Sequence, residues 1–328
     1  MNICDRPKRE LGFFPTPFYK LENLSRHFDG PSIYIKRDDM TGLAFGGNKT
    51  RKLEFLLGDA ISKKCDCVIT GGAAQSNHCR QTAAAAAMSG LECHLALGGD
   101  EPDSYTGNLL LDKLFDAKIH WCGEFRKGEK IPEIYSELQR EGKKPYIIPY
   151  GGSNSTGALG FVEAVKEIKS QSDQKKIKID RVIFASSSGG THSGLLAGNE
   201  LYKFDAKMTG IRIDKSEDDV IPYDRQVLEL SNELAAGLEL NKRFTMDDVI
   251  LRGEFMGDGY GVVGNLERSA IKLLAAKEGI LLDPVYTGRV FGAMVKMIED
   301  KEFSGDENIL FWHTGGTPAL FSYSGELL

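Results

Sequence analysis

A lysine behind two glycines is the first residue in the sequence that could carry chemistry. Lys49 lies in the segment FGGNKTRK (45–52) and begins a predicted helix. The helix dipole disfavours a cation at this end, and the neighbouring Arg51 and Lys52 add repulsion. These effects favour a neutral, nucleophilic amine that can form a Schiff base with a carbonyl compound. The alternative is a solvated basic turn on the surface.

A serine- and glycine-rich loop at 186–191 (SSSGGT) follows an apolar stretch and opens a predicted helix. Glycines let backbone N–H groups approach an anion, the helix dipole attracts it, and the hydroxyl groups can donate to it. The loop contains neither the G-K-[ST] of a Walker loop nor a G-x-G-x-x-G fingerprint. It is interpreted as a phosphate-binding cup of another kind, with an ordinary tight turn as the alternative.

Two further glycine-rich loops follow short apolar runs, one at 71–78 (GGAAQSNH) and one at 314–318 (TGGTP). In the first, Ser76 and Asn77 are typical N-cap residues for the alanine-rich stretch that comes next. The free N–H groups of that helix end could instead hold a carboxylate. His78 could be a base, a ligand or part of the capping turn.

These loops need strands and helices to position them, and the hydrophobic pattern supplies both. Short apolar strands are predicted at 32–36, 67–70, 94–97, 146–148, 182–185, 208–213 and 309–313. Helices are predicted at 80–89, 107–115, 157–169, 224–238, 266–277 and 289–300. The alternation predicts an α/β protein with open, twisted parallel sheets and helices on both faces. Ligands in such folds bind at the carboxyl ends of the strands.

Composition narrows the class of protein. The 328 residues suffice for about two domains, and a formal charge of −6 argues against nucleic acid or an anionic membrane as partner. No apolar run approaches the ~20 residues of a membrane span, and the first residues lack an apolar signal region, so a cytoplasmic protein is expected. The six cysteines include no C-x-x-C pair. Neither a disulfide framework nor a metal site is expected.

Five segments occur in order along the chain, namely FGGNKTRKLE (45–54), GGAAQSNHCRQTAA (71–84), SSSGGTHSG (186–194), LDPVYTG (282–288) and HTGGTPAL (313–320). With these segments the chain resembles the pyridoxal-phosphate enzymes of the 1-aminocyclopropane-1-carboxylate deaminase and D-cysteine desulfhydrase family, which have the tryptophan-synthase-β-like fold called fold type II. The resemblance spans essentially the whole chain.

The resemblance implies where the cofactor, pyridoxal 5'-phosphate, is held. Lys49 resembles the lysine that binds its aldehyde, with Lys52 as an extra contact to the phosphate. Asn77 is placed like the residue that bonds the phenolic oxygen, and Thr314 faces the pyridine nitrogen. The implied phosphate cup consists of Ser187, Ser188, Gly189, Gly190 and Thr191.

The resemblance also implies the groups that act on a small amino-acid substrate. Ser76 resembles the residue at the substrate carboxylate, with Asn77 and His78 beside it. Tyr260 and Tyr286 match two active-site tyrosines. In the implied mechanism the freed Lys49 amine removes the α-proton, and Tyr286 assists the leaving group.

Two threonines indicate which reaction the family resemblance implies. The cyclopropane deaminases carry glutamate at the position of Thr287 and leucine at that of Thr314, whereas both threonines, and His78, are similar to the desulfhydrase pattern. The expected reaction is therefore α,β-elimination on D-cysteine to pyruvate, hydrogen sulfide and ammonia. The alternatives are an L-cysteate sulfo-lyase and, less favoured, an aminocyclopropane-carboxylate deaminase.

The same resemblance implies an organisation in two domains. Residues 1–50 and 160–328 are expected to form a large cofactor-binding domain, and residues 51–159 a small α/β domain. The cofactor is expected in the cleft between them. A homodimer is also implied.

Overall fold

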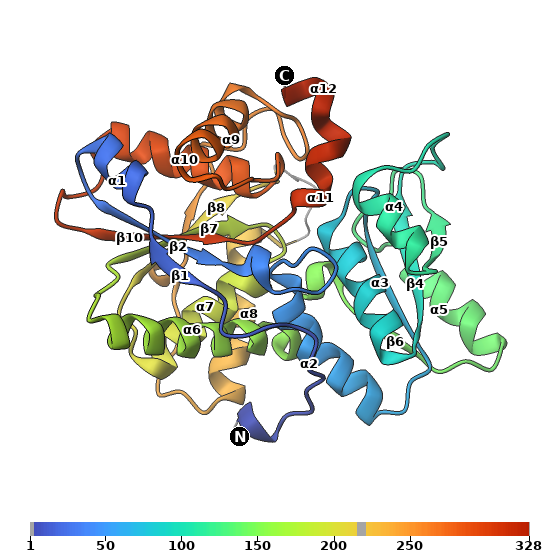
Figure 1. Cartoon of the computed structure of the whole chain (residues 1–328). Helices are drawn as coiled ribbons and strands as arrows, with labels where there is room; N and C mark the ends of the chain where they lie inside the picture. The colour runs from blue at the N-terminus through green and yellow to red at the C-terminus, as the bar shows by residue number, and fades with distance from the viewer. Residues whose placement is uncertain (1–2, 215–220, 328) are drawn as a thin grey trace.

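Two separate β-sheets form the framework of the molecule (Figure 1). The computed structural model describes residues 3–214 and 221–327. Six strands form the larger sheet in the order β1-β2-β10-β7-β8-β9, and four form the smaller one in the order β5-β4-β3-β6. The larger sheet comprises β1 (Phe18–Lys20), β2 (Ser32–Arg37), β7 (Arg181–Ser186), β8 (Lys207–Arg212), β9 (Ile250–Arg252) and β10 (Asn308–His313). The smaller sheet comprises β3 (Cys67–Ala73), β4 (Glu92–Gly98), β5 (Lys118–Trp121) and β6 (Pro145–Ile147).

Both sheets are parallel except at one edge. All neighbouring strands pair in parallel, apart from β1, which runs antiparallel to β2 with Tyr19 opposite Ile35. The α/β prediction is confirmed with this one antiparallel exception. Because a parallel arrangement requires a crossover on every connection, it also explains the helices on both faces.

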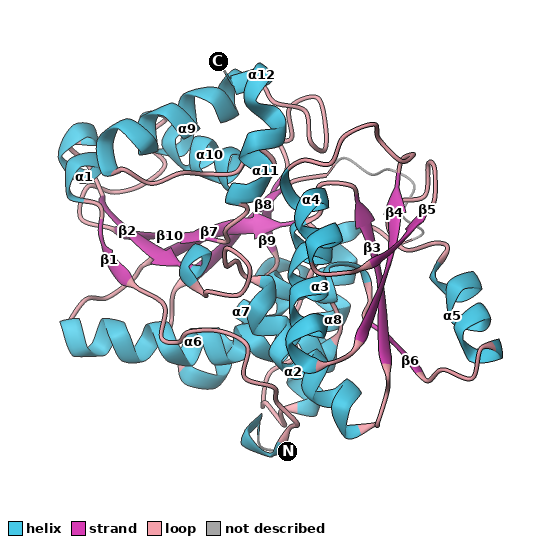
Figure 2. Ribbon diagram, turned by 45° about the vertical axis from the view of Figure 1, so that its right-hand side comes forward, coloured by secondary structure: helices cyan, strands magenta, loops and turns pink. Residues whose placement is uncertain are grey.

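Helices cover both faces of each sheet (Figure 2). On the larger sheet, α1 (Glu22–Phe28), α9 (Asn265–Glu278) and α10 (Thr287–Glu299) cover one face. The other face is covered by α6 (Ser155–Lys175), α7 (Gly190–Tyr202) and α8 (Tyr223–Gly237). On the smaller sheet, one face is covered by α2 (Lys49–Ser62), α3 (Asn77–Ser89) and α4 (Gly107–Leu114), and the other by α5 (Ile131–Arg140). A short α11 (Thr317–Leu320) and α12 (Ser324–Leu327) lie near the C-terminal end. Among the described helices, none combines the length and the apolar character needed to cross a membrane.

All seven predicted strands and all six predicted helices are present, and the largest difference in bounds is at α6, which ends at Lys175 rather than at residue 169. Among the described residues, the strands that the sequence did not predict are β1, β5 and β9, and all three are sheet edges of three or four residues. Edge strands are half solvated and short, so their hydrophobic signal is weak.

The larger sheet takes its strands from residues 18–37 and 181–313, and the smaller one from residues 67–147. The two parts are joined where α2 packs against α6. The predicted domain boundaries at 50/51 and 159/160 fall inside these two helices, and they stay a prediction.

A buried ion-pair network holds the start of α2 against the larger sheet. Arg51 donates to Asp38 through Nη2 (2.7 Å) and Nε (2.8 Å). The same guanidinium donates to Glu167 of α6, at 3.0 and 2.9 Å. Trp312 of β10 donates its indole N–H to Asp38 at 2.9 Å, and Lys36 donates to Glu167. Arg51 keeps the pKa of Glu167 low against the effect of burial, at about 2.

Asp38→Asn should therefore destabilise the protein strongly. The substitution leaves the buried Arg51 charge short of a partner, which typically costs about 3–5 kcal/mol of unfolding free energy. Chemical denaturation of the cofactor-free protein measures the loss. Asp300→Asn, which breaks a half-exposed pair with Lys296, is the matched control and should cost about 0.5 kcal/mol or less. Equal effects of the two substitutions would contradict the role given to the network.

Candidate active site

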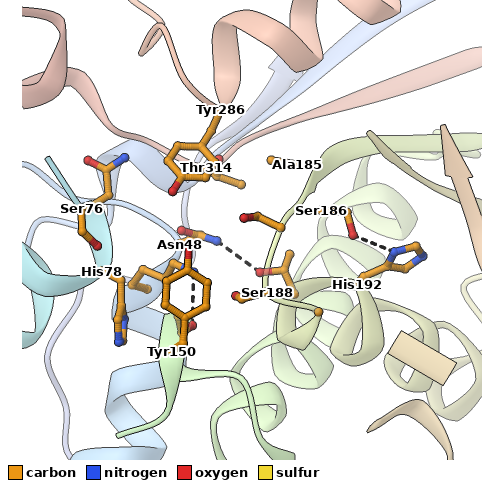
Figure 3. Close-up of a pocket in the computed structure, with 16 residues that line it drawn as sticks. Asn48, Ser76, His78, Tyr150, Ala185, Ser186, Ser188, His192, Tyr286 and Thr314 are labelled. Atoms are coloured by element: carbon orange, nitrogen blue, oxygen red, sulfur yellow. Dashed lines mark hydrogen bonds between the residues drawn. The ribbon is translucent and has the colours of Figure 1, made fainter. Parts of the chain in front are cut away.

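A single cavity collects most of the residues that the sequence singled out (Figure 3). It lies where loops at the carboxyl ends of β3, β6, β7 and β10 converge. Of the predicted site residues, those lining it are Lys49, Ser76, Asn77, His78, Ser187, Ser188, Gly189, Thr191, Tyr286 and Thr314. Those outside the described lining are Lys52, Gly190, Tyr260 and Thr287. In Figure 3, Ser76 and His78 lie on one side of the cavity, across from Ser188 and His192.

Lys49 is the first residue of α2, and its Nζ donates to the carbonyl oxygen of Gly151 at 3.2 Å. Burial lowers the pKa of Lys49 to about 8. The predicted lowering of the basicity of Lys49 is therefore present, but its cause differs in part from the expected one. Arg51 is neutralised by its carboxylate partners on another side of the helix, so desolvation rather than Arg51 dominates.

Lys52 lies one helical turn further on, behind the cavity, and is only 1% exposed. Its Nζ donates to Gly151 O (3.1 Å) and to Ser153 Oγ (3.1 Å). Burial and the charge of Lys49 hold the pKa of Lys52 well below its usual value. Neither lysine forms an ion pair with a carboxylate among the residues that the structure describes. Two buried amines that share one carbonyl oxygen and lack a counter-ion favour the binding of an anion, because it would balance their positive charge.

The serine loop lies against the same lysines. Ser188 Oγ lies 2.8 Å from Ser153 Oγ, and Gly190, the first residue of α7, donates its N–H to Ser153 Oγ at 3.1 Å. A Cβ on Gly190 would come within 2.9 Å of Lys52 Nζ and 3.0 Å of Ser153 Cα, so a larger residue here would crowd the lysine and the neighbouring backbone. Thr191 Oγ1 accepts from the side chain of Asn48 at 3.2 Å, which ties the loop to the residue before Lys49.

Ser76 caps α3 and also faces the cavity. Its Oγ accepts from the backbone N–H of Cys79 at 3.2 Å, so the capping interpretation is confirmed. Because the hydroxyl accepts in this bond, its own hydrogen stays available to a ligand.

His78 is held as a neutral imidazole. Its Nε2 lies 2.8 Å from Thr70 Oγ1. Burial and the charges of Lys49 and Lys52 hold the pKa of His78 well below its usual value. A neutral ring can orient or accept from a ligand, but it does not supply an imidazolium proton.

The two predicted tyrosines form a pair, with Tyr260 OH and Tyr286 OH 2.7 Å apart. Burial raises the pKa of both phenols well above the usual value, so both remain protonated donors at neutral pH. Tyr286 is positioned by Asp283, whose carboxylate accepts from its backbone N–H at 2.9 Å.

The two threonines that indicated the reaction occupy different places. Thr314 lines the cavity next to Tyr286 (Figure 3), and its carbonyl accepts from the backbone N–H of Asn48 at 3.0 Å. Thr287 is 1% exposed, and its hydroxyl donates to Asp283 Oδ1 at 2.7 Å. Since the Thr287 hydroxyl is already used in hydrogen bonds with Asp283, direct contact with a substrate stays a prediction for this residue.

Sequence reasoning missed a further glycine-rich loop, YGGS at 150–153, which follows β6. Gly151 adopts a positive φ of 64° and turns its carbonyl toward both lysines. Tyr150 lines the cavity, and burial raises its pKa to about 12. The rule that found the other loops, glycines directly after a strand, also describes this one.

Comparison with known proteins identifies the class of enzyme. A family model described as "Pyridoxal-phosphate dependent enzyme" matches residues 9–315. The chain belongs to this family. Two D-cysteine desulfhydrases, from Klebsiella pneumoniae strain 342 and from K. pneumoniae subsp. pneumoniae strain ATCC 700721 / MGH 78578, are each 43% identical over 332 residues and cover 99% of both chains.

Solved structures agree with this assignment. A crystal structure of an ACC deaminase homologue has a TM-score of 0.90 at 38% identity, and covers 99% of this chain and 96% of that one. Threonine deaminase isoform 2 from Solanum lycopersicum shares the fold, with a TM-score of 0.63 at 19% identity over 95% of this chain and 82% of its own.

The residues of the cavity fit pyridoxal phosphate, the cofactor of this family. A Cβ built on Gly151 would lie 2.2 Å from Ser188 Oγ and 3.3 Å from Lys49 Nζ. The lysines that lack a carboxylate partner and the serine loop therefore lie on either side of the same glycine. They are close enough for one cofactor molecule to contact both. The phosphate would supply the negative charge that Lys49 and Lys52 lack, and Lys49 has the weakened amine that an aldehyde requires.

Lys52→Met should change the stability of the protein and its affinity for the cofactor in opposite directions. Removing a buried amine without a counter-ion should raise the unfolding free energy of the cofactor-free enzyme by about 1 kcal/mol or more. Cofactor affinity, measured by titration, should fall about tenfold or more because the phosphate loses a charged donor. Lys296→Met, at an exposed lysine, should change neither quantity. A destabilised variant with unchanged affinity would refute this assignment.

The reaction of Lys49 with the cofactor should depend on pH. The amine attacks only when neutral, and its pKa is about 8. The rate at which the yellow colour appears after mixing should therefore rise as the pH increases through about 8 and then level off. Stopped-flow absorbance gives the rate, and Lys49→Ala should give no bound yellow species. A rate that is the same at about pH 6.5 and pH 9.5 would show that the amine is not the titrating group.

Proposed function

We propose that the enzyme catalyses α,β-elimination on D-cysteine, with water, to give pyruvate, hydrogen sulfide and ammonia. The observation that carries this proposal is the 43% identity to D-cysteine desulfhydrases over 99% of both chains. Thr314, which lines the cavity, supports it because the family resemblance gives the desulfhydrases threonine and the cyclopropane deaminases leucine at this position.

When bound, pyridoxal phosphate withdraws electrons from the α-carbon of the substrate, so that the α-proton and then the β-substituent can leave. Lys49 is the base, because a pKa of about 8 lets a neutral amine accept the α-proton near physiological pH. Ser76 and the N-terminal end of α3 hold the substrate carboxylate.

The tyrosine pair acts on the leaving sulfur. Tyr286 lines the cavity with its phenol protonated, so it can donate a hydrogen bond or a proton to the departing thiolate. The Tyr260 hydroxyl lies 2.7 Å from the Tyr286 hydroxyl and holds it in place. The thiolate is a good leaving group, so weak acid assistance is sufficient.

The electrostatics near the tyrosines disfavour a sulfonate substrate. Elimination of sulfite from L-cysteate requires an added cation beside the β-carbon. Arg126 lies over the ring of Tyr260, 4.7 Å from the ring centre, and its Nη2 pairs with Asp214 at 2.8 Å, while its Nη1 is buried without a hydrogen-bond partner among the described residues. Asp214 offsets part of this charge, which favours a thiol over a sulfonate.

A substrate panel tests the proposal directly. The enzyme should release pyruvate and sulfide from D-cysteine with a kcat/KM at least about a hundredfold above that for L-cysteine, L-cysteate or aminocyclopropane carboxylate. β-Chloro-D-alanine should also yield pyruvate, since it shares the configuration and a good leaving group. Pyruvate is measured in a coupled assay, with Lys49→Ala as the inactive control. Preferred turnover of L-cysteate would assign a sulfo-lyase, and preferred turnover of the cyclopropane a deaminase.

A homodimer in the cytoplasm completes the proposal. The six cysteines are all free thiols, which supports a reducing compartment. Three strongly exposed apolar side chains lie on or against the loop that precedes Lys49, namely Phe13, Met40 and Phe45. Such a patch supports burial against a second copy of the chain.

Light scattering should give twice the chain mass of 36.1 kDa. Phe45→Asp should shift the population toward monomer, because the exposed ring would be replaced by a charge at the contact. Leu114→Asp, at an equally exposed leucine of α4, should leave the mass unchanged. A wild-type monomer at micromolar concentration would contradict the dimer.

A further inference from the structure

Asn108 has a fully buried side-chain amide that lies outside the cavity and bonds Asn77, which lines it. It lies in the first turn of α4 and is 0% exposed. Its Nδ2 donates to the backbone carbonyl of Gln75 at 2.8 Å and to Asn77 Oδ1 at 2.9 Å. We propose that Asn108 is a positioning residue that orients the amide of Asn77, so that Asn77 presents a hydrogen-bond donor to the cofactor.

The orientation of both amides follows from one backbone group. A carbonyl oxygen can only accept, so the atom of Asn108 that faces Gln75 O must be its NH2 group. The same NH2 group faces Asn77, and the atom of Asn77 on that side must therefore be its oxygen. Asn77 Nδ2 is left on the opposite side, next to Gly316, where an added Cβ would come within 2.8 Å of it.

Asn108 itself is held firmly. Its backbone N–H donates to Gln75 Oε1 at 2.8 Å, and Gln75 Nε2 donates to the carbonyl of Thr106 at 3.0 Å. The intervening Gly107 has a φ of 55°, and a Cβ there would lie 2.5 Å from Gln75 Oε1 and 2.3 Å from Ser322 Oγ. The start of α4 is thus wedged between the loop before α3 and the C-terminal segment, so the Asn108 side chain is preorganised.

The consequence for the cofactor is electrostatic. The family resemblance implies that Asn77 bonds the phenolic oxygen of the cofactor. An N–H donor at Asn77 would stabilise the negatively charged form of that oxygen. An acceptor in the same place would repel that charge and favour the protonated oxygen. The inference rests on the cofactor and on that contact of Asn77, and it is independent of which amino acid is the substrate.

Asn108→Asp tests the orientation with a nearly isosteric change. Once ionised, aspartate only accepts, so in alkaline buffer the Asn77 amide should turn to donate to it and present Oδ1 to the cofactor. In the cofactor-loaded variant, the yellow long-wavelength band should fall in favour of the near-ultraviolet band of the protonated oxygen. The dissociation constant for pyridoxal phosphate should rise about tenfold or more.

Asn199→Asp is the matched control. Asn199 also donates through Nδ2 to a carbonyl, that of Ala206 at 3.1 Å, and it lies outside the described cavity lining. This variant should lower the melting temperature and leave the absorption spectrum and the cofactor affinity as in the wild type.

Two alanine variants keep the test decisive if Asn108→Asp does not fold. Asn77→Ala should weaken cofactor binding, and adding Asn108→Ala to it should weaken binding no further, because Asn108 acts through Asn77. Additive losses in the double variant would overturn the proposal. A wild-type spectrum and affinity in Asn77→Ala would also overturn it, because Asn77 would then make no contact with the phenolic oxygen.

Discussion

The buried ion pair between Arg51 and Asp38 is the constraint on which the position of the active-site lysine depends. Arg51 is the third residue of α2, and Asp38 directly follows β2. Through Glu167 and Trp312 the same network reaches α6 and β10. Buried charges are tolerated only with near-complete pairing, so this network accepts few geometries. It therefore fixes the first turn of α2, where Lys49 begins.

The same helical turn carries one paired cation and two unpaired ones. Residues three apart lie on one face of a helix, so Lys49 and Lys52 point together toward Gly151 while Arg51 points to its carboxylates. The side of the helix that carries Arg51 is anchored by its carboxylate partners. The side that carries Lys49 and Lys52 has no carboxylate partner among the described residues. A phosphate-bearing cofactor satisfies that deficit, and the low pKa of Lys49 makes its amine available to the cofactor aldehyde.

The two sheets supply different parts of the site. The four-stranded sheet presents Ser76, Asn77 and His78 at the start of α3, whereas the six-stranded sheet presents the serine loop, Tyr286 and Thr314. Small-molecule sites often lie between two such units, because each contributes the carboxyl ends of its strands. Arg126 pairs with Asp214 beside Tyr260. Asn108 bonds Asn77 of α3, and Thr106 at the start of α4 bonds Ser322 of the C-terminal segment.

The sequence by itself determined the alternation of strands and helices, the parallel sheets and the loops that carry Lys49, Ser76–His78, residues 187–191 and Thr314. These features depend on local periodicity and on glycines after strands, which a linear pattern records. Only the tertiary structure decided that Arg51 is neutralised while Lys52 is not, that the Thr287 hydroxyl bonds Asp283, and that Tyr150, Gly151 and Asn108 belong to the same assembly. Those outcomes depend on contacts between residues far apart in the chain, such as Arg51 with Glu167 or Asn77 with Asn108. Charge pairing and amide orientation are set by such partners, so residue type and spacing alone do not determine them.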